Sequence, residues 1–147
     1  MLRVARRNLP GVALARADLE RGLPAHSRRF DAVLCALVGE HLRHPSLVFG
    51  DAFDVLKPGG RLMFTVFHPE LAAAGIEANF EREGTEYRLG ALRHSVDDYL
   101  SLIDDCGFKE IQRWDFPGDH QLVTEVPWAE KYLGRPLLLA IAAHRPH

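Results

Sequence analysis

The hydrophobic positions of the chain fall into nearly continuous runs and into groups with helical spacing. The runs over 30–38 and 61–67 are typical of strands that are buried on both faces of a parallel sheet. Between them, apolar residues recur at helical spacing over 47–56, after Pro45, which suits a first helical turn. A strand, a helix and a second strand in this order predict a parallel crossover and an α/β fold.

The boundaries of a second helix are marked by individual residues. Ser95 and Asp98 have the spacing of a capping box, and Gly107 ends the apolar helix face that follows. The segments after it are expected to be a strand, a loop with a short helix and a final buried strand, over 108–114, 115–134 and 136–143.

The N-terminal segment is predicted as a short amphipathic helix over 2–9, followed by a short strand over 11–17 that ends at Asp18. The helical pattern is already running at Met1 without a capping residue, so we expect the element to begin before this sequence. Residues 70–94 show no clear period and receive no assignment.

The turn between the first helix and the second strand is the most distinctive local signal. Residues 57–60 read Lys-Pro-Gly-Gly, which predicts a tight reversal of the chain. Glycines that cradle a phosphate open a helix, whereas Gly59 and Gly60 open a strand, so we interpret them as structural.

Composition narrows the class of protein. The chain has 147 residues, 47% hydrophobic and 26% charged, with a formal net charge of -2, as in an ordinary globular domain. This charge balance favours neither a nucleic-acid partner nor an anionic membrane surface. No apolar run reaches the ~18 residues of a membrane helix, and the N-terminus lacks the apolar core of a signal peptide. We therefore expect a cytoplasmic protein.

The residues that commonly bind metals do not form a recognised motif. Cys35 and Cys106 are too few for a disulfide framework and lack zinc-site spacing, so we expect reduced thiols. Glu40, His41 and His44 lie close together in sequence, but their spacing matches none of the stronger zinc motifs. We expect no metal site.

Several short motifs occur in an order that resembles the later half of a class I S-adenosylmethionine-dependent methyltransferase. They are Asp18 after a strand, Phe30-Asp31, Glu40-His41, the VLKPGGRL segment over 55–62, Cys106-Gly107-Phe108 and the RPLL segment over 135–138. The resemblance covers nearly the whole chain. It implies a Rossmann-like, mostly parallel sheet of order 3-2-1-4-5-7-6 with an antiparallel last strand, and S-adenosylmethionine as the cofactor.

The sequence departs from this family in its cofactor loop. The family's acidic-x-Gly-x-Gly-x-Gly turn does not occur, nor does the acidic residue that ends the second strand. The resemblance then implies that residues 1–147 form a single partial domain that lacks the first two strands. We expect weak or absent cofactor binding, and an exposed sheet edge covered by a second copy of the chain or by a partner.

The resemblance also assigns candidate cofactor-binding residues. Asp18 would accept hydrogen bonds from the adenine amine and the Leu19 amide would meet a ring nitrogen. Cys35, Ala36 and Leu37 would line the methionine side. Asp18 can equally be read as a cap of the following turn, and Cys35 taken alone is better read as a small buried hydrophobe.

Two histidines are candidates for the catalytic base. His68 follows the second strand, where a substrate would approach, and His41 belongs to the Glu40-His41 pair. The aromatic residues Tyr87, Trp114, Trp128 and Tyr132 form either a lid over the substrate or ordinary packing.

The predicted function is methyl transfer from S-adenosylmethionine to a small-molecule acceptor. The first alternative is a non-catalytic Rossmann-like interaction module, or a subunit that a partner completes. The second is a nicotinamide-dependent oxidoreductase, which the absence of a G-x-G-x-x-G fingerprint disfavours.

Overall fold

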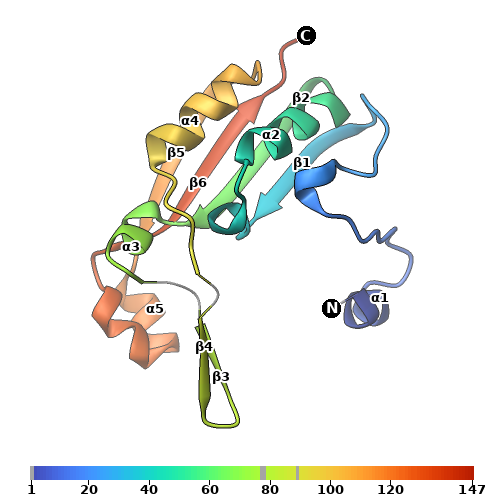
Figure 1. Cartoon of the computed structure of the whole chain (residues 1–147). Coiled ribbons are helices and arrows are strands. Elements are labelled where there is room, and N and C mark those ends of the chain that lie inside the picture. The colour runs from blue at the N-terminus through green and yellow to red at the C-terminus, as the bar shows by residue number, and fades with distance from the viewer. Residues whose placement is uncertain (1, 77–78, 89) are drawn as a thin grey trace.

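The computed structural model describes residues 2–76, 79–88 and 90–147. A four-stranded sheet lies at its centre, in the order β1 (Phe30–Ala36), β2 (Leu56–Phe67), β6 (Pro136–His144) and β5 (Lys109–Pro117) (Figure 1). β1 and β2 are parallel, whereas β6 is antiparallel to both β2 and β5. β1, β2 and β5 therefore share one direction. This confirms the predicted α/β fold with an antiparallel last strand, and the order corresponds to strands 4-5-7-6 of the expected sheet.

Helices and a small hairpin surround the sheet. The α-helices are α1 (Leu2–Asn8), α2 (Pro45–Val55), α3 (Pro69–Ala73), α4 (Val96–Asp105) and α5 (His120–Glu125). The 3-10 helices are η1 (Leu19–Arg21), η2 (Gly39–His41) and η3 (Pro127–Tyr132), and the hairpin consists of β3 (Asn79–Arg82) and β4 (Thr85–Arg88). The helices predicted after Pro45 and after Ser95 are thus confirmed, as is the capping box that begins α4.

The core lies on one face of the sheet, between the strands and helices α2 and α4 (Figure 1). Phe49 of α2 and Tyr99 of α4 both contact Phe64 of β2, with ring centroids 5.1 and 4.9 Å apart. The alternate residues Leu62, Phe64 and Val66 are fully buried, because every second side chain of β2 points toward these helices. The helical spacing of the apolar residues in α2 and α4 therefore supplies one half of a two-layer core.

The other face of the sheet is apolar and exposed. Strand register places Leu34 beside Met63, and Phe67 and Phe116 beside the same residue of β6. The large apolar side chains on this face are Leu34, Met63, Phe67, Trp114 and Phe116, all of them exposed. The expectation that the strands over 30–38 and 61–67 are buried on both faces is therefore wrong. β1 pairs only with β2 among the described residues, and helices cover only one of its faces.

The strand expected over 11–17 is also not formed. Residues 12–18 belong to no helix or strand. A strand exists only where a neighbouring strand takes up its backbone hydrogen bonds, and none of the described strands runs beside this segment. The apolar and polar residues of this segment are therefore not sufficient to form a strand.

The Lys-Pro-Gly-Gly turn lies inside β2. Leu56 pairs with Phe30 and Arg61 pairs with Ala32, so residues 57–60 form a bulge between two paired positions. Gly59 adopts a φ of 76°, which favours glycine, and its amide donates to the Arg145 carbonyl oxygen at 2.9 Å. The tight reversal predicted between the helix and the strand is therefore wrong: β2 begins at Leu56, directly after α2, and residues 57–60 are a bulge within it.

The segment over 70–94, which received no assignment, contributes α3 and the β3–β4 hairpin. The hairpin extends away from the sheet (Figure 1), and its strands are exposed throughout. Residues 77, 78 and 89 of this segment lie outside the described part. Within the part of the chain that is described, every helix is too short or too polar to cross a membrane.

Candidate functional site

The carboxyl ends of β1 and β2 meet at one edge of the sheet, which is the usual ligand-binding edge of open α/β folds. β1 ends at Ala36, and Leu37 and Val38 lead into η2. β2 ends at Phe67, and His68 follows as the N-cap of α3. The predicted site residues Cys35, Ala36, Leu37, His41 and His68 are therefore all brought to this edge, although they do not all face the same space.

Leu37 adopts an unusual backbone conformation at this edge. Its φ is 53°, in the left-handed region that costs energy for residues with a side chain. Its amide donates to the Thr65 carbonyl oxygen at 2.8 Å, which fixes the turn against β2. Such strain persists where the surrounding structure holds it, and it is frequent at binding sites.

Gly39 allows η2 to approach the core closely. A Cβ atom at this position would lie 2.5 Å from Cζ of Phe64 and 3.1 Å from a methyl carbon of Val66. Any side chain would therefore clash with two fully buried residues. Because Gly39 has no side chain, η2 lies close to the core and places the next residue, Glu40, at its edge.

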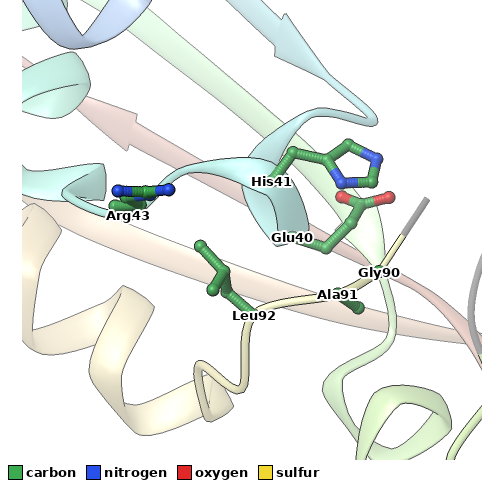
Figure 2. A pocket seen from close by; sticks show the side chains of 6 residues that line it. All are labelled: Glu40, His41, Arg43, Gly90, Ala91 and Leu92. Carbon is green, nitrogen blue, oxygen red and sulfur yellow. The ribbon is translucent and has the colours of Figure 1, made fainter.

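Glu40 is a buried acidic residue with an unsatisfied atom. Its side chain is 7% exposed, and its Oε2 atom has no hydrogen-bond partner among the described residues. It lines a pocket of about 300 Å³ (Figure 2). The lining residues are Glu40, His41, Arg43, Gly90, Ala91 and Leu92.

Two long-range hydrogen bonds hold the opposite wall of this pocket in place. The Leu92 amide donates to the Glu40 carbonyl oxygen at 2.8 Å, and Nε2 of His94 lies 2.7 Å from the Leu42 carbonyl oxygen. The segment that returns from the hairpin is thereby fastened across η2. The pocket is thus formed by segments some 50 residues apart in sequence.

The environment of Glu40 affects two neighbouring groups. Burial raises the pKa of the Cys35 thiol to about 11, and the Glu40 carboxylate adds to this effect. Burial, together with the charges of Glu40, Asp98 and Cys35, raises the pKa of Tyr99 above its ordinary value. Both side chains therefore stay protonated and uncharged near neutral pH.

Asp18 and Leu19 lie at the start of η1. The Asp18 carboxylate accepts a hydrogen bond from the Glu20 amide at 3.1 Å, so it caps this short helix, as in the alternative reading. Its Oδ2 atom also lies 3.3 Å from Nε of Arg21, and its side chain is 58% exposed. A carboxylate has several acceptor positions, so capping leaves room for a further donor.

The Glu20 side chain attaches η1 to the pocket region. Its carboxylate accepts hydrogen bonds from the amides of Arg43 and His44, directly after η2 and before α2. Because these amides precede the first turn of α2, an acidic partner also suits the helix dipole. Asp18 and Leu19 are therefore held on the η2 side of the sheet.

His68 and His41 have contrasting surroundings. His68 is 1% exposed: its Nδ1 atom accepts from the Glu70 amide at 3.3 Å, and its Nε2 atom lies 2.8 Å from Oδ1 of Asp115. Both ring nitrogens are thus engaged, with Nε2 as the donor to the carboxylate. His41 is exposed on η2, and it lines the same pocket as Glu40 (Figure 2).

Asp115 connects His68 to a second basic group. Its carboxylate accepts hydrogen bonds from Arg113 Nη2 at 2.8 Å and Nε at 2.9 Å. The Arg113 guanidinium, and then the hydrogen bond from His68, hold the pKa of Asp115 below its ordinary value. Sequence reasoning missed this link, because Asp115 was placed in a loop and no spacing rule pairs it with His68.

Comparison with known proteins agrees with this architecture. Residues 1–64 match a family model described as a methyltransferase domain. The crystal structure of an S-adenosylmethionine-dependent methyltransferase from Mesorhizobium loti superimposes with a TM-score of 0.78 at 23% identity, over 99% of this chain and 76% of that chain. The fold is that of the class I S-adenosylmethionine-dependent methyltransferases. Solved structures that share this fold, from Mesorhizobium loti and Listeria monocytogenes, are described as S-adenosylmethionine-dependent methyltransferases.

The curated relatives match shorter stretches of the methyltransferase fold. Phthiotriol/phenolphthiotriol dimycocerosates methyltransferase 1 of Mycobacterium ulcerans is 36% identical over 74 residues, which span 50% of this chain and 27% of the relative. Ribosomal RNA small subunit methyltransferase B of Escherichia coli is 35% identical over 60 residues, or 41% of this chain and 14% of the relative. The chain thus spans about a quarter or less of these proteins.

The methyltransferase fold does not by itself fix the reaction. The [4+2]-cyclase SpnF also superimposes on this chain, with a TM-score of 0.66 at 19% identity, over 97% of this chain and 60% of that chain. Function must therefore be argued from the site.

The residues of this chain fit S-adenosylmethionine in part. Asp18 offers exposed acceptor atoms, and Leu19 opens η1, whose first amides have no partner within the helix. The protonated Cys35 thiol suits an uncharged lining at the end of β1. The glycine-rich turn that would wrap the methionine end does not occur in this sequence. Among the described residues, no group of three or more potential ligands forms a metal site.

Proposed function

We propose that this chain forms the acceptor-facing part of a methyltransferase domain, which transfers a methyl group from S-adenosylmethionine to a small-molecule acceptor. The observation that carries the proposal is the pocket of about 300 Å³ at the carboxyl edge of β1 and β2. It opens beside Glu40 and His41, which follow directly on the candidate cofactor residues Cys35, Ala36 and Leu37. A small concave pocket at this edge is where the fold class places its ligands.

The residues of this chain would bind and orient the cofactor. When bound, S-adenosylmethionine supplies an electrophilic methyl group on its sulfonium centre. Asp18 would accept from the adenine amine, the Leu19 amide would donate to a ring nitrogen, and residues 35–37 would line the methionine end. Alignment of the acceptor with that methyl group provides much of the rate, because the reaction is a direct displacement.

A base is needed only for acceptors that must lose a proton. His41 is exposed at the pocket and free to approach an acceptor. His68 is the other candidate, and its Nδ1 atom would have to release the Glu70 amide before it could take up a proton, because Nε2 already carries the proton that it donates to Asp115.

A small molecule is favoured over RNA as the acceptor. The formal net charge is -2, whereas binding to RNA phosphates is dominated by basic side chains. The relative from Mycobacterium ulcerans is named for phthiotriol and phenolphthiotriol dimycocerosates, and the Escherichia coli relative for ribosomal RNA, so the two names do not decide between a small molecule and RNA. Filter binding of labelled RNA at physiological salt should show no retention by this chain.

Cofactor binding tests the proposed function directly. Equilibrium dialysis with tritium-labelled S-adenosylmethionine should show weak binding, because the loop for the methionine end is missing from the sequence. The variant Asp18→Ser keeps an N-cap residue for η1 but removes the carboxylate, and should weaken binding about tenfold. The variant Glu130→Gln, at an exposed position of η3, should leave binding unchanged.

Two outcomes of this titration would contradict the cofactor site as proposed. If Asp18→Ser binds as well as the wild type, the adenine site is misplaced. A micromolar dissociation constant would contradict the expectation of weak binding, because it would show that the missing loop is not needed.

A second candidate function is a non-catalytic module that pairs through the exposed apolar sheet face with a second copy of the chain. The observation that favours it is the exposure of Leu34, Met63, Phe67, Trp114 and Phe116 on that face. Arg61 brings a positive charge to the same side of β2, where it pairs with His144 of β6. A stoichiometric dimer without S-adenosylmethionine binding would favour this function over methyl transfer.

A further inference from the structure

The Glu40 carboxylate is a buried acidic group that no described residue satisfies. Its side chain is 7% exposed, and Oε2 has no hydrogen-bond partner in the described part of the chain. A polar atom that is removed from water without a partner destabilises the folded protein. In native proteins such an atom calls for an explanation, and one explanation is a ligand that supplies the missing donor.

The side chains around Glu40 do not supply that donor. Cys35 and Tyr99 interact with it electrostatically and keep their protons near neutral pH, yet neither donates a hydrogen bond to Oε2. Two basic residues line the pocket, and Figure 2 shows Arg43 on the opposite side of η2 from the carboxylate. His41 lines the same pocket as the carboxylate, yet Oε2 receives no hydrogen bond from it.

The backbone position of Glu40 is fixed by the fold. Gly39 holds η2 against Phe64, and the Leu92 amide donates to the Glu40 carbonyl oxygen at 2.8 Å. The backbone of Glu40 is therefore held from both sides. A group held in this way does not have to be ordered when a ligand binds, which favours affinity.

We propose that Glu40 recognises a positively charged amine on a small methyl acceptor. An ionised carboxylate can only accept hydrogen bonds, and a cationic N–H donor gives a shorter and stronger bond than a neutral hydroxyl. Ala91 and Leu92 offer apolar surface on the opposite wall of the pocket, so the remainder of the ligand is an alkyl or aryl group. The inference rests on the proposed methyltransferase function for calling this ligand the acceptor, whereas the binding itself does not depend on it.

Paired amines and alcohols test this inference. Binding to the full chain is measured by calorimetry for 2-phenylethylamine and for a short series of alkylamines, each beside the alcohol of the same carbon skeleton. We expect each amine that fits to bind about tenfold more tightly than its alcohol. Glu40→Gln, which keeps the size of the side chain, should abolish this difference, and Glu130→Gln should preserve it.

Each outcome is informative. The inference is overturned if no amine binds more tightly than its alcohol, or if Glu40→Gln keeps the preference. Should Glu40→Gln fail to fold, the comparison of amine with alcohol on the wild type still decides. Titration with S-adenosylmethionine separates the two proposals: amine binding without cofactor binding overturns the methyltransferase function alone, and cofactor binding without amine preference overturns the role of Glu40 alone.

Discussion

The identity of the residues at the carboxyl edge could be predicted from sequence, but their environment could not. Cys35 and His41 lie at the edge where the motif order placed them. The burial of Glu40 depends on the close approach of Gly39 to Phe64 and on the bond from Leu92, which are contacts between distant parts of the chain. His68 was expected to face a substrate, and its contact with Asp115 arises from the pairing of β5 with β6.

The raised pKa of Cys35 predicts that its thiol reacts slowly with alkylating agents. The pKa is about 11, so only a small fraction of this thiol is ionised at pH 8, and the thiolate is the reactive form. Burial also raises the pKa of Cys106. Alkylation of Cys35 by iodoacetamide should be at least about a hundredfold slower in the folded chain than in urea, as followed by mass spectrometry. Equal rates in both conditions would contradict the buried environment of Cys35.

We predict that the buried carboxylate of Glu40 lowers the stability of the folded chain but is needed for ligand binding. Glu40→Met replaces it with an apolar side chain of similar length that needs no hydrogen-bond donor. We expect the free energy of unfolding to increase by about 1 kcal/mol, while amine binding is lost. Urea denaturation gives the stability, and Glu130→Met is the matched change at an exposed position. A destabilised Glu40→Met chain would mean that the carboxylate has a structural partner.

Elements with strong boundary residues were predicted well, and elements that depend on partners were not. The helix after Ser95 begins and ends where its capping box and Gly107 indicate. The strand over 11–17 failed because it has no neighbour to pair with. The four-residue strands of the hairpin were missed because they are too short to show a period, and they form only by pairing with each other.

The capping box of α4 predicts that loss of the Ser95 hydroxyl changes both the stability of the fold and the pKa of Asp98. The Ser95 hydroxyl accepts from the Asp98 amide at 3.0 Å, and the Asp98 carboxylate accepts from the Ser95 amide at 2.7 Å. Ser95→Ala should lower the free energy of unfolding at pH 7 by about 1 kcal/mol. It should also move the pKa of Asp98 part of the way back up toward 3.8, because one of the hydrogen bonds that lower it is lost.

The pH dependence of this change in stability follows from the direction of the pKa shift of Asp98. The folded-state pKa of Asp98 is depressed, so the stability linked to its charge is present above about pH 3.8 and is lost as the pH falls through the folded-state pKa. The difference between wild type and Ser95→Ala should therefore shrink in acid. NMR titration of the Asp98 carboxyl and urea unfolding at several pH values check both parts. A constant difference across this range would contradict the linkage.

At the scale of the molecule, the sheet and the helices on one of its faces form two layers of a three-layer sandwich. The order of the motifs correctly predicted which strands are neighbours and which one is antiparallel. It did not predict that helices cover one face only, because a nearly continuous apolar run has the same appearance whether one or both faces are packed. The exposed face holds the apolar side chains that the second helical layer of a doubly wound fold would bury.

This exposed face predicts self-association. Leu34 is 69% exposed on the open edge strand, and Met63 and Phe67 continue the apolar surface across β2. Contiguous apolar surface of this kind is removed from water when two copies meet, so the sedimentation coefficient should rise with protein concentration. Leu34→Lys places a charge on the edge strand and should shift the chain toward the monomer. Leu47→Lys, at a 48% exposed position of α2, should not, because Leu47 lies on the helical side of the sheet. A wild type that sediments as a compact monomer at all concentrations would show that the exposed face alone does not drive association.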